Sequence, residues 1–307
     1  MLETLRNAWK VQDLRKKILY TAMILLVFRI GANIPVPFID TNALSELFAQ
    51  LSETGSALSY LNIFTGGGLS NATLFAMSIS PYINASIILQ LLTVAIPALE
   101  AIAKEGEEGR RKIASWTRYL TVVIGLIQGF SYYVMLRNYN LLSTTHWLAV
   151  ATLILTFMAG SAVVMWLGEH ITEHGIGNGI SIILFAGIIS RGPQLIQTFW
   201  NMIAGGNVRS IVEAVVMILV GLFILTFIVY MQNAERRIPI QYAKRVVGRK
   251  VYGGQSTHLP IKVNATGVMP IIFTSSILSI PATVEMFWPA ERGPLASAVF
   301  SMFAQTS

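Results

Sequence analysis

The sequence lacks cysteine and is poor in charged residues, which make up 12% of its 307 positions. Without cysteine the chain has no disulfide scaffold, no thiolate nucleophile and no cysteine-ligated metal site. A soluble domain carries about 25% charged residues, whereas 54% of this chain is hydrophobic and its mean hydropathy is +0.61. The composition excludes a disordered protein and indicates an integral membrane protein.

The central parts of the long apolar runs contain almost no ionisable residues. Arg29 lies toward the outer part of the first run and Glu285 at the exit of the last, where both side chains can snorkel to an interface. Buried Asp, Glu, His or Lys residues usually mark ion and proton pathways. Their scarcity argues against a transporter driven by a proton or sodium gradient.

Seven apolar runs are long enough to span a membrane, which takes about 20 residues. The fifth is interrupted by Gly187, Arg191, Gly192 and Pro193, and Pro81 should bend the second. The fold class is therefore an all-α polytopic membrane protein. The predicted spans are 18–37, 74–96, 117–136, 147–167, 178–200, 211–231 and 265–284.

Basic residues are distributed unequally between the two sides of the membrane. When the loops alternate, seventeen of the 22 fall on one side, within residues 6–17, 104–118 and 236–262. The opposite side has four, which are Arg137, Arg191, Arg209 and Arg292. Because cytoplasmic loops carry an excess of Lys and Arg, we expect a cytoplasmic N-terminus and residue 307 on the far side.

Two segments lie outside this pattern of spans. Residues 1–17 have no cleavage site after their basic head and should form a cytoplasmic amphipathic helix. Residues 55–73 include Gly66, Gly67 and Gly68, and are too polar to span but too apolar for an ordinary loop. Because broken backbone at membrane depth must be shielded by protein or water, we expect a re-entrant half-helix here.

The stretch GEHITEHGIGNGIS, residues 168–181, invites a metal interpretation. His170 and His174 are four residues apart, with Glu169 and Glu173 beside them, which could form a metal site on a helix. The order differs from the zinc-protease pattern and no third ligand is evident, so a solvated helix end is the simpler interpretation. The glycines that follow favour a tight turn, after which Asn178 can cap the next helix.

The loop 234–264 contains seven basic residues and one acid, Glu235. Alternation in QYAKRVV and KVYGGQS predicts a protruding hairpin, with Gly253 and Gly254 near the end of its second strand. Such a projection suits an anionic partner such as RNA or an acidic protein, although the charge alone would also follow from its cytoplasmic side.

Several stretches, taken in order, resemble the SecY family, the central subunit of the general protein-translocation channel. They cover nearly the whole chain and are closest to the bacterial pattern. They are FRIGANIPVP (28–37), SPYINASIILQLLT (80–93), KEGEEGRRKI (104–113), MWLGEHITEHGIGNGISIILFAGI (165–188), ERRIPIQYAKR (235–245) and GRKVYGGQSTHLPIKVNATGVMPIIFTSSIL (248–278).

The resemblance implies ten helices in two pseudo-symmetric halves around an hourglass pore. A plug would fall at about 57–72, and Gln90 and Asn264 match polar positions of a lateral gate that opens to lipid. The pore ring would include Ile79, Ile83, Ile180, Leu184 and Ile272. The surface that receives the ribosome or SecA would include Arg236, Arg237, Lys244, Arg245, Arg249 and Lys250.

The implied protein is a channel in the cell membrane and not an enzyme, with no cofactor or metal. Its implied partners are SecE and SecG, the SecA motor ATPase, the ribosome, signal sequences, nascent polypeptides and the lipid bilayer. We divide the chain into the N-terminal helix 1–17, a five-helix half at 18–200, the sixth and seventh helices at 201–284, and a tail at 285–307.

Two features depart from the family pattern. Phe38 stands where the family usually has Gly after Pro-x-Pro. The chain also stops after the seventh span, so we expect a truncated or fragmentary form, or a second chain that supplies three more helices. The alternatives are a small-molecule secondary transporter with its site at the broken fifth span, and a membrane metalloenzyme based on His170 and His174.

Overall fold

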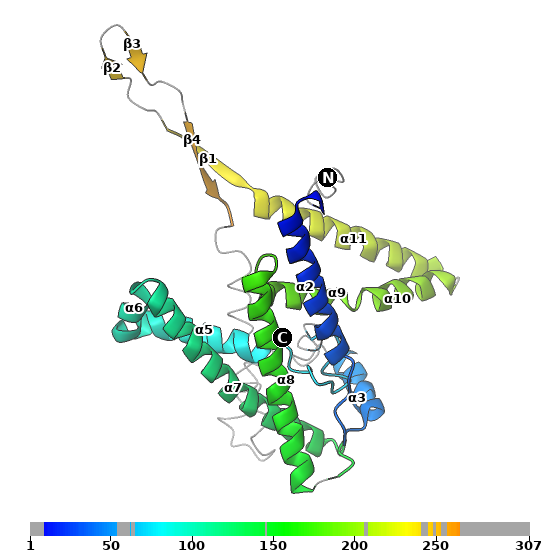
Figure 1. Ribbon diagram of the computed structural model, residues 1–307. Helices are drawn as coiled ribbons and strands as arrows, with labels where there is room; N and C mark the ends of the chain where they lie inside the picture. The colour runs from blue at the N-terminus through cyan, green and yellow to red at the C-terminus, as the bar shows by residue number, and fades with distance from the viewer. Residues whose placement is uncertain are drawn as a thin grey trace, which may run out of the picture. The chain divides into compact units, whose positions relative to one another are not determined.

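The computed structural model describes residues 9–53, 62, 65–144, 146–205, 208–240, 245–247, 250–252 and 257–264 (Figure 1). The chain divides into two compact units. The first comprises residues 1–193 and 275–307, and the second comprises residues 194–274. The seventh predicted span, 265–284, and residues 1–8 of the predicted N-terminal helix lie outside the described residues.

The described part of the first unit is helical. Its core is the antiparallel pair of α7 and α8, with α5 packed on α7, and α2 and α9 packed on α8. Its helices are α2 (Gln12–Gly31), α3 (Thr41–Glu53), α5 (Ser80–Ala95), α6 (Pro97–Lys104), α7 (Glu107–Asn138), α8 (Trp147–His174) and α9 (Gly179–Ile189). Helix α10 (Gly192–Ala204) begins at the boundary between the units.

The described helices that could span a membrane agree with most of the predicted spans. Within the described residues, α7, α8, α11 (Val208–Asn233) and the stretch Gly179–Ala204 are long and apolar enough to cross a bilayer. Helices α5 and α6 pass only as a pair, bent by 104°. Helix α2 does not qualify, because any 18-residue stretch of it includes four basic residues, Arg15, Lys16, Lys17 and Arg29.

The predicted second span was wrong in its start and in its bend. Residues 74–79 form turns, with Ser78 at φ 47°, and α5 begins only at Ser80. Pro81 lies in the first turn, where its missing N–H has no intrahelical partner to lose. The sharp change of direction occurs instead between Ala95 and Pro97.

Helix α9 ends at Ile189 and α10 starts at Gly192. Ser190 and Arg191 form the turn between them. This confirms that the fifth run is broken at the Arg-Gly-Pro sequence, because Pro193 is tolerated in the first turn of a helix but not in its interior.

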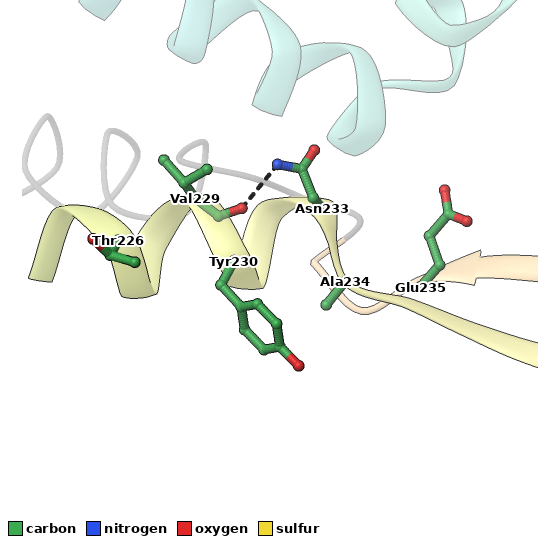
Figure 2. A pocket seen from close by; sticks show the side chains of 6 residues that line it. All are labelled: Thr226, Val229, Tyr230, Asn233, Ala234 and Glu235. Atoms are coloured by element: carbon green, nitrogen blue, oxygen red, sulfur yellow. Dashed lines mark hydrogen bonds between the residues drawn. The ribbon is translucent and has the colours of Figure 1, made fainter. Parts of the chain in front are cut away.

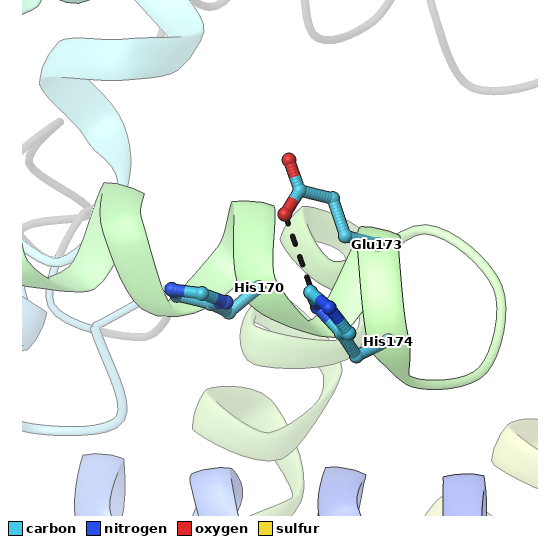
Figure 3. A group of neighbouring side chains, drawn as sticks. All are labelled: His170, Glu173 and His174. Atoms are coloured by element: carbon cyan, nitrogen blue, oxygen red, sulfur yellow. Dashed lines mark ion pairs between the residues drawn. The ribbon is translucent and has the colours of Figure 1, made fainter.

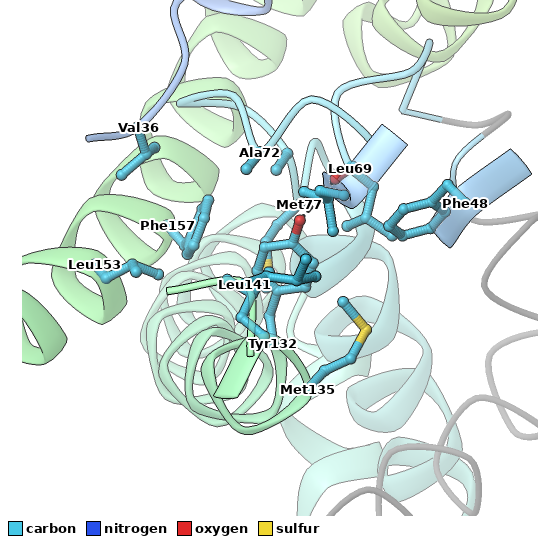
Figure 4. Packing of buried hydrophobic residues seen from close by; sticks show 13 residues of the cluster. Val36, Phe48, Leu69, Ala72, Met77, Tyr132, Met135, Leu141, Leu153 and Phe157 are labelled. Atoms are coloured by element: carbon cyan, nitrogen blue, oxygen red, sulfur yellow. Dashed lines mark hydrogen bonds between the residues drawn. The ribbon is translucent and has the colours of Figure 1, made fainter. Parts of the chain in front are cut away.

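Two buried apolar clusters stabilise the first unit. One joins α3, the turns at 65–79, α7 and α8, and Figure 4 shows Tyr132 and Phe157 within it. Their rings meet edge to face at 5.0 Å, a favourable aromatic geometry. The other, which we call the aliphatic cluster, lies where α2, α8 and α9 meet the residues just before α5, and it also contains the stacked rings of Phe28 and Phe75.

The second unit carries an antiparallel arm that continues from α11 (Figure 1). Strand β1 (Glu235–Ile240) pairs with β4 (Thr257–Lys262), with Glu235 opposite Lys262. Strands β2 (Arg245–Val247) and β3 (Lys250–Tyr252) pair in turn, with Val247 opposite Lys250. The predicted hairpin is thereby confirmed. Helix α11 buries only Ala214 among its described side chains, as expected of a helix that faces lipid.

Candidate functional site

Four of the five residues predicted to line the pore come together in the aliphatic cluster. Ile79 is completely buried just before α5, and Ile83 packs partly buried beside it. Ile180 and Leu184 approach from α9. Ile272 lies outside the described residues. The buried members of the cluster are Ile24, Phe28, Phe75, Ile79, Val164, Leu167, Ile171 and Ile183.

Gly168 in α8 is the point on which this cluster converges. A Cβ atom at this position would lie 3.4 Å from Cδ1 of Ile79 and 3.5 Å from Cγ1 of Ile180. It would lie equally close to Cδ1 of Ile183, at 3.5 Å. These are ordinary contact distances, so Gly168 marks the place where the residue just before α5 and two residues of α9 pack over α8. Ile183 is completely buried, and nothing in the sequence distinguishes it from its apolar neighbours in this respect.

The start of α9 is fixed by two neighbouring residues. The side-chain oxygen of Asn178 accepts hydrogen bonds from the backbone N–H groups of Ile180 and Ser181, at 3.0 and 3.4 Å. This confirms the predicted cap. A Cβ atom at Gly179 would collide with the carbonyl oxygen of Gly168, so Gly179 permits the backbones of α8 and α9 to approach closely.

The turns at residues 65–79 are held by buried hydrogen bonds. The backbone N–H of Val36 donates to the carbonyl of Ala72 at 2.9 Å, and that of Leu74 donates to Ile34 at 2.9 Å. The hydroxyl of Tyr132 in α7 donates to the carbonyl of Leu69 at 2.6 Å. Of the re-entrant segment predicted at 55–73, the structure describes Asn62 and residues 65–73, and the latter form turns.

The turn that contains Gly66 and Gly67, which we call the glycine turn, lies directly against the break between α9 and α10. A Cβ atom at Gly66 would be 2.7 Å from both the carbonyl oxygen of Gly187 and Oγ of Ser190. One at Gly67 would be 3.0 Å from a guanidinium nitrogen of Arg191. Both glycines have positive φ, 67° and 88°. The backbone conformation and the close contacts therefore both require glycine here.

An ion pair that the sequence did not suggest joins α7 to α8. Nε of Arg118 lies 2.8 Å from Oε1 of Glu169, and the glutamate side chain is only 22% exposed. The residues are separated by 51 positions, so no local spacing rule could have paired them. The contact joins the N-terminal part of α7 to the C-terminal part of α8.

The predicted lateral-gate residues are Gln90 and Asn264, which belong to different units. Gln90 is exposed on α5, and Asn264 is exposed just after β4. Among the residues predicted to receive the ribosome or SecA, Arg236 and Arg237 are exposed on β1. Arg245 begins β2 and Lys250 begins β3. Lys244 and Arg249 lie outside the described residues.

Two further features have some of the character of a ligand site. A hollow of about 520 Å³ at the junction of α11 and β1 is lined by Thr226, Val229, Tyr230, Asn233, Ala234 and Glu235 (Figure 2). Glu235 is its only charged lining residue. The second feature is the predicted histidine pair, which Figure 3 shows with Glu173 on the last turns of α8.

The fold and the site together define a polytopic helical membrane protein in which interrupted helices meet at an aliphatic cluster. Comparison with known proteins gives the family. A family model described as SecY matches residues 73–306. The Protein translocase subunit SecY of Streptomyces scabiei is 43% identical over 304 residues, which are 95% of this chain and 69% of that relative. The one from Thermotoga maritima is 46% identical, over 92% of this chain and 66% of that relative. The chain belongs to the SecY family.

Solved structures agree at the level of the fold. "The structure of a protein conducting channel" matches with a TM-score of 0.61 at 19% identity, over 91% of this chain and 61% of that chain. Sec61 in a canine ribosome-channel complex matches with a TM-score of 0.59 at 19% identity. The chain thus spans about two thirds of its curated relatives and less of these structures. Its family membership places it among membrane channel subunits rather than enzymes.

Proposed function

We propose that this chain forms the pore and one wall of the lateral gate in a Sec protein translocase of the cell membrane. In this proposal, unfolded secretory polypeptides cross the membrane through it, and membrane segments leave sideways into lipid. The observation that carries the proposal, beyond family membership, is the meeting of Ile79, Ile83, Ile180 and Leu184 in the aliphatic cluster. Aliphatic constrictions can seal by excluding water, and they offer no fixed ligand to a passing chain.

The glycine turn supports the proposal of a plug at about 57–72. Its close fit against Gly187, Ser190 and Arg191 holds the end of this segment beside the aliphatic cluster, because α9 contributes both to the cluster and to the contact. The residues of the turn that face this break are glycines, Gly66 and Gly67, so on this side the contact is made by backbone. Leu69 and Ala72 of the same segment belong to the first buried cluster, so we infer that displacement of a plug would have to free these residues as well as the contact with α9.

The arm suits the proposed role of a receptor for the ribosome or SecA. Arg236 and Arg237 are exposed on β1. Three apolar residues are 41–50% exposed beside them, Ile238 on β1 and Leu259 and Ile261 on β4. Such a surface can bind an anionic partner through its charges and a protein through its apolar side chains. By the resemblance, SecE and SecG would bind the helical part of the protein, and Gln90 and Asn264 would contribute to the gate.

A photo-crosslinking residue in place of Ile180 tests the pore assignment. Membranes containing the chain are challenged with a stalled secretory nascent chain, with and without its signal sequence. We expect adducts that depend on the signal sequence. A full-length SecY-family member with the crosslinker at the matching position is the positive control, and Val216, exposed on α11, gives a matched site in this chain. Adducts at Val216 as strong as those at Ile180 would contradict the pore assignment. So would the absence of adducts both at Ile180 and at the matching position of the full-length control.

A further inference from the structure

The last two turns of α8 place three metal-binding side chains on one face. His170, Glu173 and His174 each offer one ligand atom, and these atoms all lie within 4.8 Å of one another (Figure 3). The spacing explains the geometry, because residues three and four positions apart are neighbours on a helix surface. A single turn of α8 thus supplies two imidazoles and a carboxylate.

The neighbouring acid, Glu169, is held elsewhere. Its carboxylate pairs with Arg118 at 2.8 Å, so it does not compete for the same position. Glu173 is 60% exposed, and its Oε2 lies 3.8 Å from Nδ1 of His174. An exposed pair at this distance contributes little stability, so an ion entering between the two groups would displace only a weak contact.

Aromatic side chains position both imidazole rings. The ring of Trp166 meets that of His170 edge to face at 4.5 Å, and the ring of Tyr20 from α2 lies 5.9 Å from that of His174. Nδ1 of His170 is buried and has no hydrogen-bond partner among the described residues.

We propose that His170, Glu173 and His174 bind one divalent transition-metal ion of the zinc class at the end of α8. Two imidazole nitrogens and a carboxylate oxygen are a ligand set that Zn²⁺ accepts, with water at the remaining position. Metal-binding histidines usually have their second nitrogen hydrogen-bonded, and Nδ1 of His170 is not. The site is therefore an exchangeable surface site, distinct from the aliphatic cluster and not needed for folding.

Isothermal titration of the purified full chain with Zn²⁺ in detergent tests this proposal, using an affinity tag without histidine. We expect one ion bound per chain. His170→Ala and His174→Ala should each weaken binding by about tenfold or more, and Glu173→Gln by a smaller factor. His258→Ala is the matched control, because His258 is exposed on β4, and it should bind as the parent does. Thermal unfolding without metal should be the same for all variants.

Two results would overturn the proposal. One is a parent chain that binds no Zn²⁺ up to millimolar concentration. The other is binding that survives the double variant His170→Ala, His174→Ala, which would place the ion elsewhere. Neither result would bear on the channel, because none of the three residues belongs to the proposed pore.

Discussion

Phe38 adopts a left-handed backbone conformation, with φ at 72°, which costs an L-residue about 1 kcal/mol. The residue is 42% exposed, so removing its ring also loses part of a buried surface, which offsets some of the gain. We expect Phe38→Gly to raise the free energy of unfolding by up to about 1 kcal/mol, measured by thermal unfolding in detergent. Phe38→Ala removes the same ring but keeps the Cβ atom. If alanine stabilised as much as glycine, backbone strain would not be the cause.

Tyr132 donates the hydrogen bond that joins α7 to the turns at 65–79. Tyr132→Phe leaves the carbonyl of Leu69 without this buried partner, which should lower the free energy of unfolding by about 1–3 kcal/mol. Amide hydrogen exchange should rise in residues 65–79. Tyr133→Phe is the control, because Tyr133 is also buried but its hydroxyl makes no hydrogen bond within the described part of the chain. Equal losses in both variants would contradict the proposed role of this bond.

At the scale of elements, the cap of α9 determines where this helix begins relative to α8. Asn178→Ala removes an acceptor for two backbone N–H groups and should cost about 0.5–2 kcal/mol of stability. Asn178→Asp keeps an acceptor at the same position and should retain most of that stability. Chemical denaturation of the three proteins in detergent measures the difference. A loss with aspartate as large as that with alanine would exclude capping as the cause.

The contact between the glycine turn and α9 gives another prediction for an element. Gly66→Ala introduces a Cβ atom 2.7 Å from the carbonyl oxygen of Gly187, so the turn must move away from α9. Because the chain has no cysteine, a single cysteine in place of the buried Ala76 can report this movement through faster maleimide labelling. Gly177→Ala is the matched control, because Gly177 has a similar φ of 63° but open space around it. Faster labelling in both variants would point to general loosening.

Sequence reasoning succeeded where a physical signal was local. Apolar length predicted α7, α8 and α11, the Arg-Gly-Pro sequence predicted the break after α9, and Asn178 predicted its cap. It failed where tertiary contacts decide. The turns at 74–79 are as apolar as a helix, yet backbone hydrogen bonds between Leu74 and Ile34 and between Val36 and Ala72 hold the start of this stretch in another conformation. The helix α3 was also missed, as a short amphipathic segment that packs through Leu44 and Phe48.

The candidate site shows the same division. The motif match brought forward Ile79, Ile83, Ile180 and Leu184, and the structure gathers them in one cluster. Residue types alone could not have selected them, since most isoleucines in spans face lipid or other helices. The pairing of Arg118 with Glu169 and the contact of Gly67 with Arg191 depend on how helices pack. Neither has a sequence spacing that predicts it.

At the scale of the whole molecule, the distribution of basic residues predicts the orientation in the membrane. Helices α7 and α8 are antiparallel and joined by a short connection, so the basic segment at 104–118 and the end of α8 must lie on one side. That side should be cytoplasmic because it carries seventeen of the 22 basic residues. The connection between the two helices, with Tyr139 exposed, should face outward.

Single cysteines test this orientation in the cysteine-free chain. A membrane-impermeant maleimide applied to intact cells should label Tyr139→Cys and should not label His258→Cys on the arm. After the cells are opened, both should react, since both positions are exposed, and this step controls for reactivity. Labelling of His258→Cys alone in intact cells would mean that the orientation is reversed. It would also place the arm on the wrong side for a ribosome or SecA, so the same experiment decides whether the arm can serve as their receptor.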